Sequence, residues 1–311
     1  QTMKTVAAEI APEMYDRMLI AVDGSDEARR AARRGLHLAR VFDATVTVLS
    51  VVERKALQLT ETSAEEAELR ERGERALTEI EELASELGQS VTTTLTEGKP
   101  AVRISEYAVE QDADLIVVGR QGLTGLGRRL LGGVTEQVLH RSDVPVFVVP
   151  DEGADGEIEA DYSRVLVTTD GSENADAAIP HGTAIARRYD SDVHVLNVVD
   201  IQAAGGVFHA GGLETEFVER LDARGQATVD SAASKIEDAA PALSVTTAVE
   251  RTTSFEGVAA GVREYVQNHD IDLVVMGSHG RSNLRRQLIG SVASTVLRTV
   301  DVPVLVVKRP D

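Results

Sequence analysis

Apolar and polar positions along this chain repeat in two ways, which predict two kinds of element. Short, nearly continuous apolar runs, such as residues 18–22 (MLIAV) and 115–119 (LIVVG), are typical of strands buried on both faces. Between such runs apolar residues recur at helical spacing, as at Ala28, Ala32 and Leu36. The sequence therefore predicts an α/β protein in which helices cover both faces of a parallel sheet.

The expected elements follow the same order in each half of the chain, β-α-β-α-β-α-β-α-β. In the first half we expect strands at 18–22, 45–52, 91–95, 115–119 and 144–149, with helices that begin at Ser25 or Asp26, at 64, at 100 and after Gly132. In the second half we expect strands at 164–169, 193–199, 244–249, 273–276 and 302–307, with helices at 173–189, 213–239, 254–268 and after Gly290.

The two halves are an internal duplication. Residues 119–149 and 277–307 align without a gap and are identical at 15 of 31 positions, and both contain the glycine spacing G-x2-G-x9-G. We expect a first domain at 1–150 with an extension at 1–16, an acidic linker at 151–161, and a second domain at 162–311.

The second copy is longer than the first. Asp23 precedes Gly119 by 96 residues, whereas Asp170 precedes Gly277 by 107. We assign these eleven extra residues to the glycine-rich segment 203–212, which could be a lid over a pocket but is more simply read as a surface loop that the fold tolerates.

The topology expected for such a chain brings two distant motifs together. Right-handed crossovers that start from a central first strand place strand 4 beside strand 1, and open α/β sheets bind ligands at the carboxyl ends of strands where the winding reverses. Asp23 follows strand 1 and Gly119 follows strand 4, with Asp170 and Gly277 as the second pair. Each pair should meet at one crevice.

Composition narrows the class of protein. The net charge is −19, lysine is rare and aromatic residues make up 3%, which predicts a halophilic, archaeal source and argues against nucleic-acid binding. The absence of cysteine is consistent with a cytoplasmic location. No apolar run is long enough to predict a membrane span, and residues 1–17 lack the apolar run of a secretory signal.

The glycine loop suggests a site for an anion. Gly277 and Gly280 permit unusual backbone angles and close approach of a ligand, and Gly290-Ser291 opens a helix whose first amides lack partners within the helix. The P-loop pattern and the Rossmann GxGxxG pattern are absent. As alternatives, the glycines could serve tight turns and close packing, and Asp23 and Asp170 could simply cap the following helices.

Other candidate side chains are less informative. Arg128, Arg129, Arg285 and Arg286 lie between the second and third glycines and could clamp phosphates or form a solvated basic face. His279 could contact phosphate or be merely exposed. No His/Asp/Glu cluster has metal-ligand spacing, so Mg²⁺ is expected only as a companion of ATP. No serine has the context of a catalytic nucleophile.

Taken together, the G-x2-G-x9-G-[ST] loop after strand 4, V-D-G-S or T-D-G-S after strand 1 and D-V-P-V at the last strand resemble the universal stress protein family. The resemblance covers about 15–150 and 162–309. It implies two tandem open parallel five-stranded sheets of strand order 3-2-1-4-5 that bind ATP, ADP or AMP. In repeat 2 the resemblance maps the pocket to Thr168, Thr169, Asp170, Val198, Met276, Gly277, His279, Gly280, Gly290, Ser291, Val292 and Ala293. In repeat 1 the matching positions are Ala21, Val22, Asp23, Val51, Val118, Gly119, Gln121, Gly122, Gly132, Gly133, Val134 and Thr135.

Repeat 1 departs from the family pattern at Gly133, where the family has Ser or Thr. We therefore expect weaker nucleotide binding there, unless Thr135 supplies the missing hydroxyl. The resemblance also implies that the two final strands, as sheet edges, pair within the chain as a pseudo-dimer, and two chains could associate further.

Three classes of function remain open: a nucleotide-binding stress or signalling module, an enzyme with at most slow ATP hydrolysis, and a non-nucleotide interaction scaffold.

Overall fold

The computed structural model describes residues 14–53, 63–123, 130–151, 161–202, 215–280 and 289–309. Its strands are β1 (Arg17–Val22), β2 (Thr45–Glu53), β3 (Thr92–Gly98), β4 (Leu115–Gly119), β5 (Val146–Val149), β6 (Arg164–Thr168), β7 (Asp192–Asp200), β8 (Val245–Thr252), β9 (Leu273–Gly277) and β10 (Val304–Val307). Its longer helices are α1 (Asp26–Phe42), α2 (Ser63–Glu86), α3 (Pro100–Glu110), α4 (Gly133–Arg141), α5 (Glu173–Tyr189), α7 (Thr215–Ala239), α8 (Val258–Asn268) and α9 (Ser291–Thr299).

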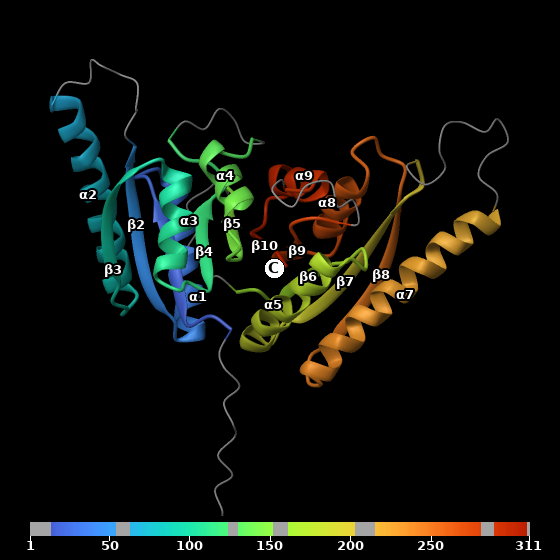
Figure 1. Ribbon diagram of the computed structural model, residues 1–311. Coiled ribbons are helices and arrows are strands. Elements are labelled where there is room, and N and C mark those ends of the chain that lie inside the picture. Colours follow the sequence, from blue (N-terminus) through green and yellow to red (C-terminus); the bar gives the residue numbers. More distant parts are fainter. Residues whose placement is uncertain are drawn as a thin grey trace, which may run out of the picture.

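All ten strands belong to one sheet, in the order β3-β2-β1-β4-β5-β10-β9-β6-β7-β8 (Figure 1). The predicted order 3-2-1-4-5 is confirmed in each half, and the strands within each half are parallel. The two expected five-stranded sheets are joined into one, because the two final strands, β5 and β10, pair within the chain as predicted, in antiparallel fashion. Apolar strands with unpaired backbone groups favour such pairing.

The strands at this junction are buried along their whole length. Val304 pairs with Val148 and Leu305 pairs with Phe147, and all four side chains are buried. The final strands therefore lie at the centre of the molecule rather than at an edge. The remaining edges are β3 and β8, whose side chains are largely half-exposed.

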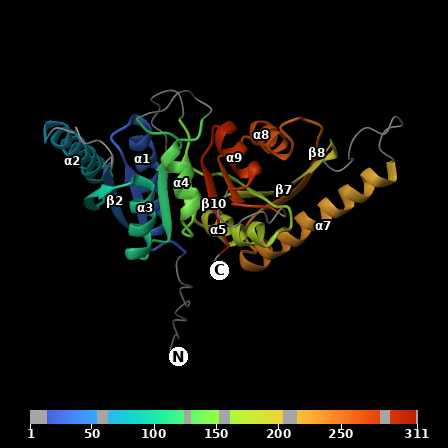
Figure 2. The same cartoon turned by 45° about the horizontal axis from the view of Figure 1, so that its top comes forward.

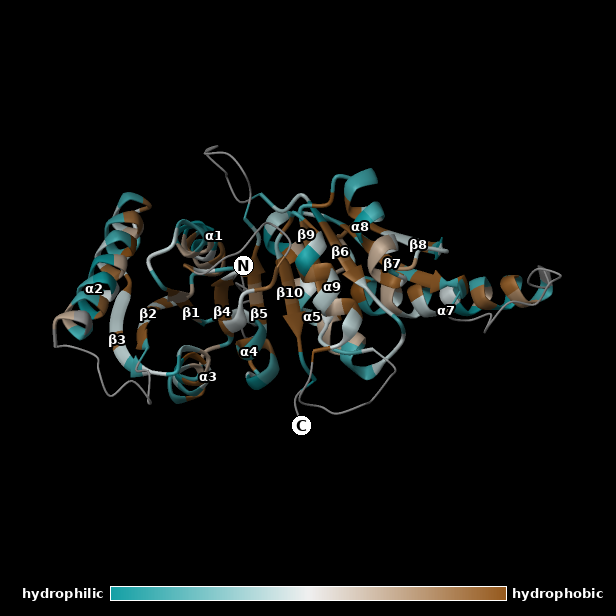
Figure 3. Cartoon of the chain, turned by 90° about the horizontal axis from the view of Figure 1, so that it is seen from above, coloured by the Kyte–Doolittle hydropathy of each residue, from teal (hydrophilic) through white to brown (hydrophobic). Residues whose placement is uncertain are grey.

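The helices cover both faces of the sheet and bury one continuous core on each. One core includes residues of α1, α2, α5 and α7, and the other includes residues of α3, α4, α8 and α9. Figure 3 shows the apolar strands between helices whose outer surfaces are hydrophilic. In Figure 2 the long helices α2 and α7 lie at opposite ends of the molecule.

The extra residues of repeat 2 do not all lie in 203–212. Thr47 pairs with Thr92, 45 residues later, whereas the equivalent His194 pairs with Thr246, 52 residues later. That difference accounts for seven of the eleven extra residues. The other four extra residues precede α8. Helix α8 begins twelve residues after Thr246, whereas α3 begins eight residues after Thr92. The helix expected from residue 254 accordingly starts only after Gly257, whose φ is +58°. Residues 203–212 themselves lie outside the described ranges.

Candidate functional site

The acid that follows the first strand of each repeat lies against the glycine loop that follows the fourth. A Cβ placed on Gly280 would lie 2.6 Å from Asp170 Oδ2, and one on Gly122 would collide with Asp23 Oδ2. The pairs β1–β4 and β6–β9 are neighbours in the sheet, so these contacts occur at the expected reversal of winding. The predicted convergence is therefore present in both repeats.

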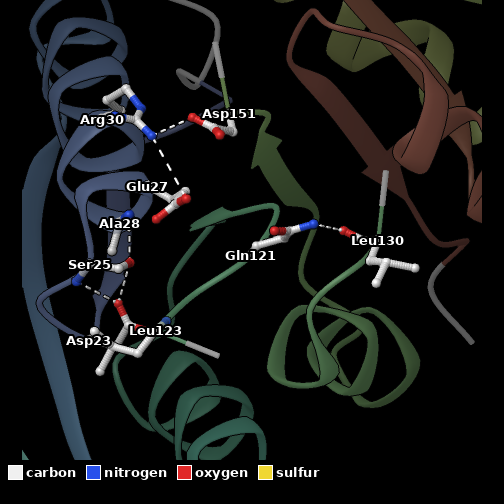
Figure 4. A network of polar contacts seen from close by, with 9 residues as sticks. All are labelled: Asp23, Ser25, Glu27, Ala28, Arg30, Gln121, Leu123, Leu130 and Asp151. Carbon is white, nitrogen blue, oxygen red and sulfur yellow. Dashed lines mark hydrogen bonds and ion pairs between the residues drawn. The ribbon is translucent and has the colours of Figure 1, made fainter. Parts of the chain in front are cut away.

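These aspartates do not cap the following helices. Asp23 Oδ1 accepts hydrogen bonds from the backbone N–H and the hydroxyl of Ser25, at 3.0 and 2.6 Å, while Ser25 Oγ accepts from Ala28 N–H at 3.1 Å (Figure 4). In repeat 2 the cap of α5 is likewise Ser172, which accepts from Ala175 N–H at 3.3 Å. The alternative that the aspartates serve as caps is thus wrong, and serine holds that position.

In repeat 1 the acid is fully engaged by the protein. Asp23 Oδ2 accepts from Leu123 N–H at 3.0 Å, which ties the carboxylate to the first residue after Gly122 (Figure 4). The nearby Gln121 side chain is buried and donates to Leu130 O at 2.5 Å. The loop of repeat 1 is thus held closed by contacts within the chain.

The loop glycines are needed for space and not for unusual backbone angles. Neither Gly277 nor Gly280 is among the glycines of positive φ, so the expectation of special backbone conformations there is wrong. A Cβ on Gly277 would lie 2.7 Å from the carbonyl carbon and oxygen of Asn174. Positive φ occurs instead at Gly24 and Gly171, the middle residues of the two Asp-Gly-Ser turns. Close packing of strand and helix thus explains part of the glycine pattern.

The third glycine of each loop precedes a helix that has no side-chain cap. Gly290 donates its N–H to Ser278 O at 2.8 Å and is the N-cap of α9, and Ser291, the first residue of α9, is exposed. Gly132 and Gly133 have the same positions at α4. Helix starts of this kind carry partial positive charge and amides without helical partners, which suits an anion.

Thr135 does not replace the hydroxyl that repeat 1 lacks. Its side chain is buried and donates to Gly119 O at 2.8 Å. The hydroxyl is therefore directed at the end of β4. Gly133, by contrast, is exposed, and a Cβ added to it would meet no atom within 4 Å.

An apolar wall adjoins the helix start in repeat 2. Val198, Met276, Val292 and Ala293 all belong to, or pack against, the same core. Helix α8 approaches this wall closely, since a Cβ on Gly261 would lie 2.6 Å from Val198 Cγ1.

His279 lies at the junction of the repeats. Its Nδ1 is 2.9 Å from Ser278 Oγ, and its buried Nε2 has no hydrogen-bond partner among the described residues. Burial lowers the pKa of His279, and the charges of Lys308 and His140 lower it further. The imidazole is therefore neutral near pH 7, which weakens the reading of His279 as a charged phosphate contact.

The remaining predicted positions lie where the motif places them. Ala21, Val22, Val51 and Val118 are at the carboxyl ends of β1, β2 and β4, Val134 is in the first turn of α4, and Thr168 and Thr169 are at the end of β6. Arg128, Arg129, Arg285 and Arg286 lie outside the described residues.

One polar residue beside the predicted site was not expected from the sequence. Asn197 donates to Thr169 O at 2.7 Å, and a polar residue inside the apolar run VHVLNVV was the signal that could have revealed it.

Two further searches covered the described ranges. They contain no group of three or more His, Cys, Asp or Glu residues that could hold a metal ion. Within the same ranges, no helix combines the length and apolar character needed to cross a membrane.

Comparison with known proteins gives a consistent result. The universal stress protein family matches residues 14–150 and 161–308. Universal stress protein MJ0531 of Methanocaldococcus jannaschii is 39% identical over 140 residues, which cover 44% of this chain and 82% of that protein. A universal stress protein of Mycolicibacterium smegmatis is 28% identical over 303 residues, 94% of this chain and 96% of the relative.

Among solved structures, a universal stress protein from Archaeoglobus fulgidus has a TM-score of 0.71 at 22% identity and covers 96% of this chain and 99% of its own. A universal stress protein solved in complex with cAMP covers 44% of this chain and 97% of its own, with 27% identity and a TM-score of 0.36.

Proposed function

For this chain, which belongs to the universal stress protein family, we propose that repeat 2 binds an adenine nucleotide, ATP or its products ADP and AMP. The protein would act as a stress-response or signalling module rather than as a fast catalyst. The observation that carries the proposal is the contact of Asp170 Oδ2 with Gly280, which sets a carboxylate beside the glycine loop at the reversal of winding.

Each part of the site has a chemical role in this proposal. Asp170 accepts from the ribose or faces the base, and the wall that contains Val198 and Met276 packs against the base. The amides of Ser291, Val292 and Ala293 bind phosphate, with the Ser291 hydroxyl as a further donor. Hydrogen bonds to a charged partner contribute roughly 1.5–3 kcal/mol each, so a few amides suffice for micromolar binding without lysine. Mg²⁺ would enter only with ATP.

Repeat 1 should bind more weakly for reasons within its own loop. Gly133 offers no hydroxyl where repeat 2 has Ser291, and the Thr135 hydroxyl donates to Gly119 O. A nucleotide would therefore find fewer donors in repeat 1.

Calorimetry with ATP, ADP, AMP and cAMP tests the proposal. Wild type should bind one adenine nucleotide tightly. Ser291→Ala should weaken binding, and Gly290→Val should abolish it, because a Cβ there would lie 3.1 Å from Ser278 O. The comparison is Gly132→Val, the same change at the other loop, which should leave one nucleotide bound and weaken its binding by no more than about tenfold, the size of an ordinary coupling between sites. No binding by wild type would favour the non-nucleotide scaffold, and equal occupancy of both repeats at sub-saturating ATP would contradict the ranking of the sites.

The other parts of the proposal have their own tests. Multiple ATP turnovers that Gly290→Val abolishes would instead support a hydrolase. The net charge of −19 supports an absence of nucleic-acid partners, and the lack of cysteine supports a cytoplasmic location. A homodimer would assemble outside the β5–β10 junction, because both final strands are already paired within the chain.

A further inference from the structure

Arg120 is a buried cation that crosses between the two repeats. It follows Gly119 at the end of β4 and is 1% exposed. Its Nη1 donates to the carbonyl of Val300 at 2.9 Å, and Val300 is the C-cap of α9 in the other repeat. Burial lowers the pKa of Arg120, while Asp301 and Asp151 favour its charged form. A cation at the carbonyl end of a helix is favourable, which explains why this charge is tolerated inside.

The backbone of the same residue belongs to the glycine loop of repeat 1. Arg120 N–H donates to Val149 O at 2.7 Å, and Arg120 O accepts from Gly132 N–H at 2.8 Å. Gly132 is the N-cap of α4. A displacement of this loop would therefore move the guanidinium that holds α9.

Helix α9 connects that contact to the proposed nucleotide site. It starts after Gly290 in the loop of repeat 2 and ends at Val300, nine residues and about 13 Å away. Because β5 and β10 are antiparallel, the carboxyl ends of the two sets of strands lie at opposite edges of the sheet at this junction. Helix α9 thus begins beside one loop and ends beside the other, and its residues Ala293, Val296 and Leu297 are buried in the core.

The contact in the opposite direction, from repeat 2 to the end of α4 in repeat 1, is made by a different part of the chain. The residue equivalent to Arg120 is Ser278, whose hydroxyl lies 2.9 Å from Nδ1 of its neighbour His279. The carbonyl of His140, near the end of α4, is instead held by Lys308 Nζ at 2.7 Å, from beyond the end of β10. In this direction the residue that holds the other repeat's helix is therefore Lys308, which follows the last strand, whereas Arg120 belongs to the glycine loop.

We propose that Arg120 is a positioning residue that couples the glycine loop of repeat 1 to the helix start of repeat 2 through α9. Repeat 1, the weaker nucleotide site, thereby acts as a regulatory domain for repeat 2. The regulatory part rests on the proposed nucleotide binding, whereas the coupling between loop and helix does not.

The first experiment compares ATP affinity of the full chain by calorimetry. Arg120→Met should raise the Kd of repeat 2 about tenfold, within the range of ordinary couplings between sites. The control is Arg298→Met, which removes another α9 cation that bridges the repeats, at 3.7 Å from Glu136, without touching either loop. Its Kd should stay within about twofold of wild type. Equal Kd values for wild type and Arg120→Met would overturn the regulatory part.

The second experiment is a double-mutant cycle, which distinguishes coupling through Arg120 from a purely structural role of that residue. Gly132→Val perturbs the loop of repeat 1, since a Cβ there would lie 3.2 Å from Arg120 O. It should accelerate backbone hydrogen exchange of the first hydrogen-bonded amides of α9, beginning with Ser294 N–H, which donates to Gly290 O, several-fold in wild type and much less in Arg120→Met. Additive effects of the two changes would overturn the coupling.

The double-mutant cycle is measured by hydrogen exchange without nucleotide. Its result therefore tests the coupling through Arg120 independently of the proposed nucleotide binding. A wild-type chain that binds no ATP would refute the proposed function and the regulatory role, while the cycle still decides the coupling. Should Arg120→Met not fold, Arg120→Lys replaces it in both experiments. Lysine keeps the charge but lacks the planar fork of arginine, so the same loss of coupling is expected.

Discussion

Single positions in this protein differ in how much free space surrounds them, and this separates glycines that the fold requires from one that it does not. A Cβ would collide at Gly122, Gly277 and Gly280 but would meet nothing at Gly133. Gly133 is the first residue of α4, and glycine is unfavourable in a helix because it loses the most backbone freedom on folding.

Gly133→Ser should therefore stabilise the protein, by roughly 0.5–1 kcal/mol. The change also restores the hydroxyl that Ser291 supplies in repeat 2, so ATP binding at repeat 1 should increase. Urea unfolding measures the first effect, and calorimetry on a Gly290→Val background isolates the second. Gly277→Ala is the contrasting control and should destabilise the chain, because its Cβ would lie 2.7 Å from the backbone carbonyl of Asn174. A destabilised Gly133→Ser would contradict this account.

At the scale of elements, the helices that follow β1 and β6 begin in the same way. Ser25 Oγ accepts from Ala28 N–H at 3.1 Å and Ser172 Oγ accepts from Ala175 N–H at 3.3 Å, and the backbone N–H of each serine donates to the aspartate two residues before it. Serine is therefore the N-cap of the first helix in both repeats.

Removal of either cap should destabilise the protein to a similar degree. Ser25→Ala and Ser172→Ala should each cost roughly 0.5–2 kcal/mol of unfolding free energy, the range ordinary for N-caps. Denaturant unfolding of both variants provides the measurement. A variant as stable as wild type would contradict the capping role of its serine.

At the scale of the whole molecule, the two repeats share cores and polar contacts across their junction. Tyr15, which precedes β1, has its hydroxyl 2.7 Å from Nδ1 of His181 in α5, and Tyr15 is fully buried. Burial lowers the pKa of His181 to about 4 and raises that of Tyr15. The repeats are therefore joined by a half-buried neutral histidine as well as by β5 and β10.

This contact should make stability depend on pH. As pH falls from about 6.5 to about 4, unfolded chains take up a proton at His181 before folded chains do, so stability present above 6.5 is lost in this window. The loss from this group is of order 3 kcal/mol. Denaturant unfolding at several pH values should show a shallower slope for His181→Gln than for wild type. An unchanged slope would show that His181 does not contribute.

The charge of the molecule predicts a response to salt. With a net charge of −19, repulsion among carboxylates opposes the folded state and is screened by ions. The melting temperature should therefore rise from low salt to molar KCl, in keeping with the predicted halophilic source. A melting temperature indifferent to salt would argue against that source.

The sequence by itself determined the elements, the duplication, the strand order and the meeting of Asp170 with the glycine loop. Those features follow from local periodicity and from rules for parallel sheets, which depend on few long-range details. Element ends shifted by a few residues, as at α8, because four residues before it form a turn with no apolar pattern.

Only the tertiary structure decided that the joined copies form one continuous sheet and which glycines are confined. The paths of the Arg120 side chain to Val300 and of the Thr135 hydroxyl to Gly119 depend on atoms far away in the sequence. Packing sets such contacts through the positions of neighbouring elements, and no pattern local to Arg120 or Thr135 encodes where those neighbours lie.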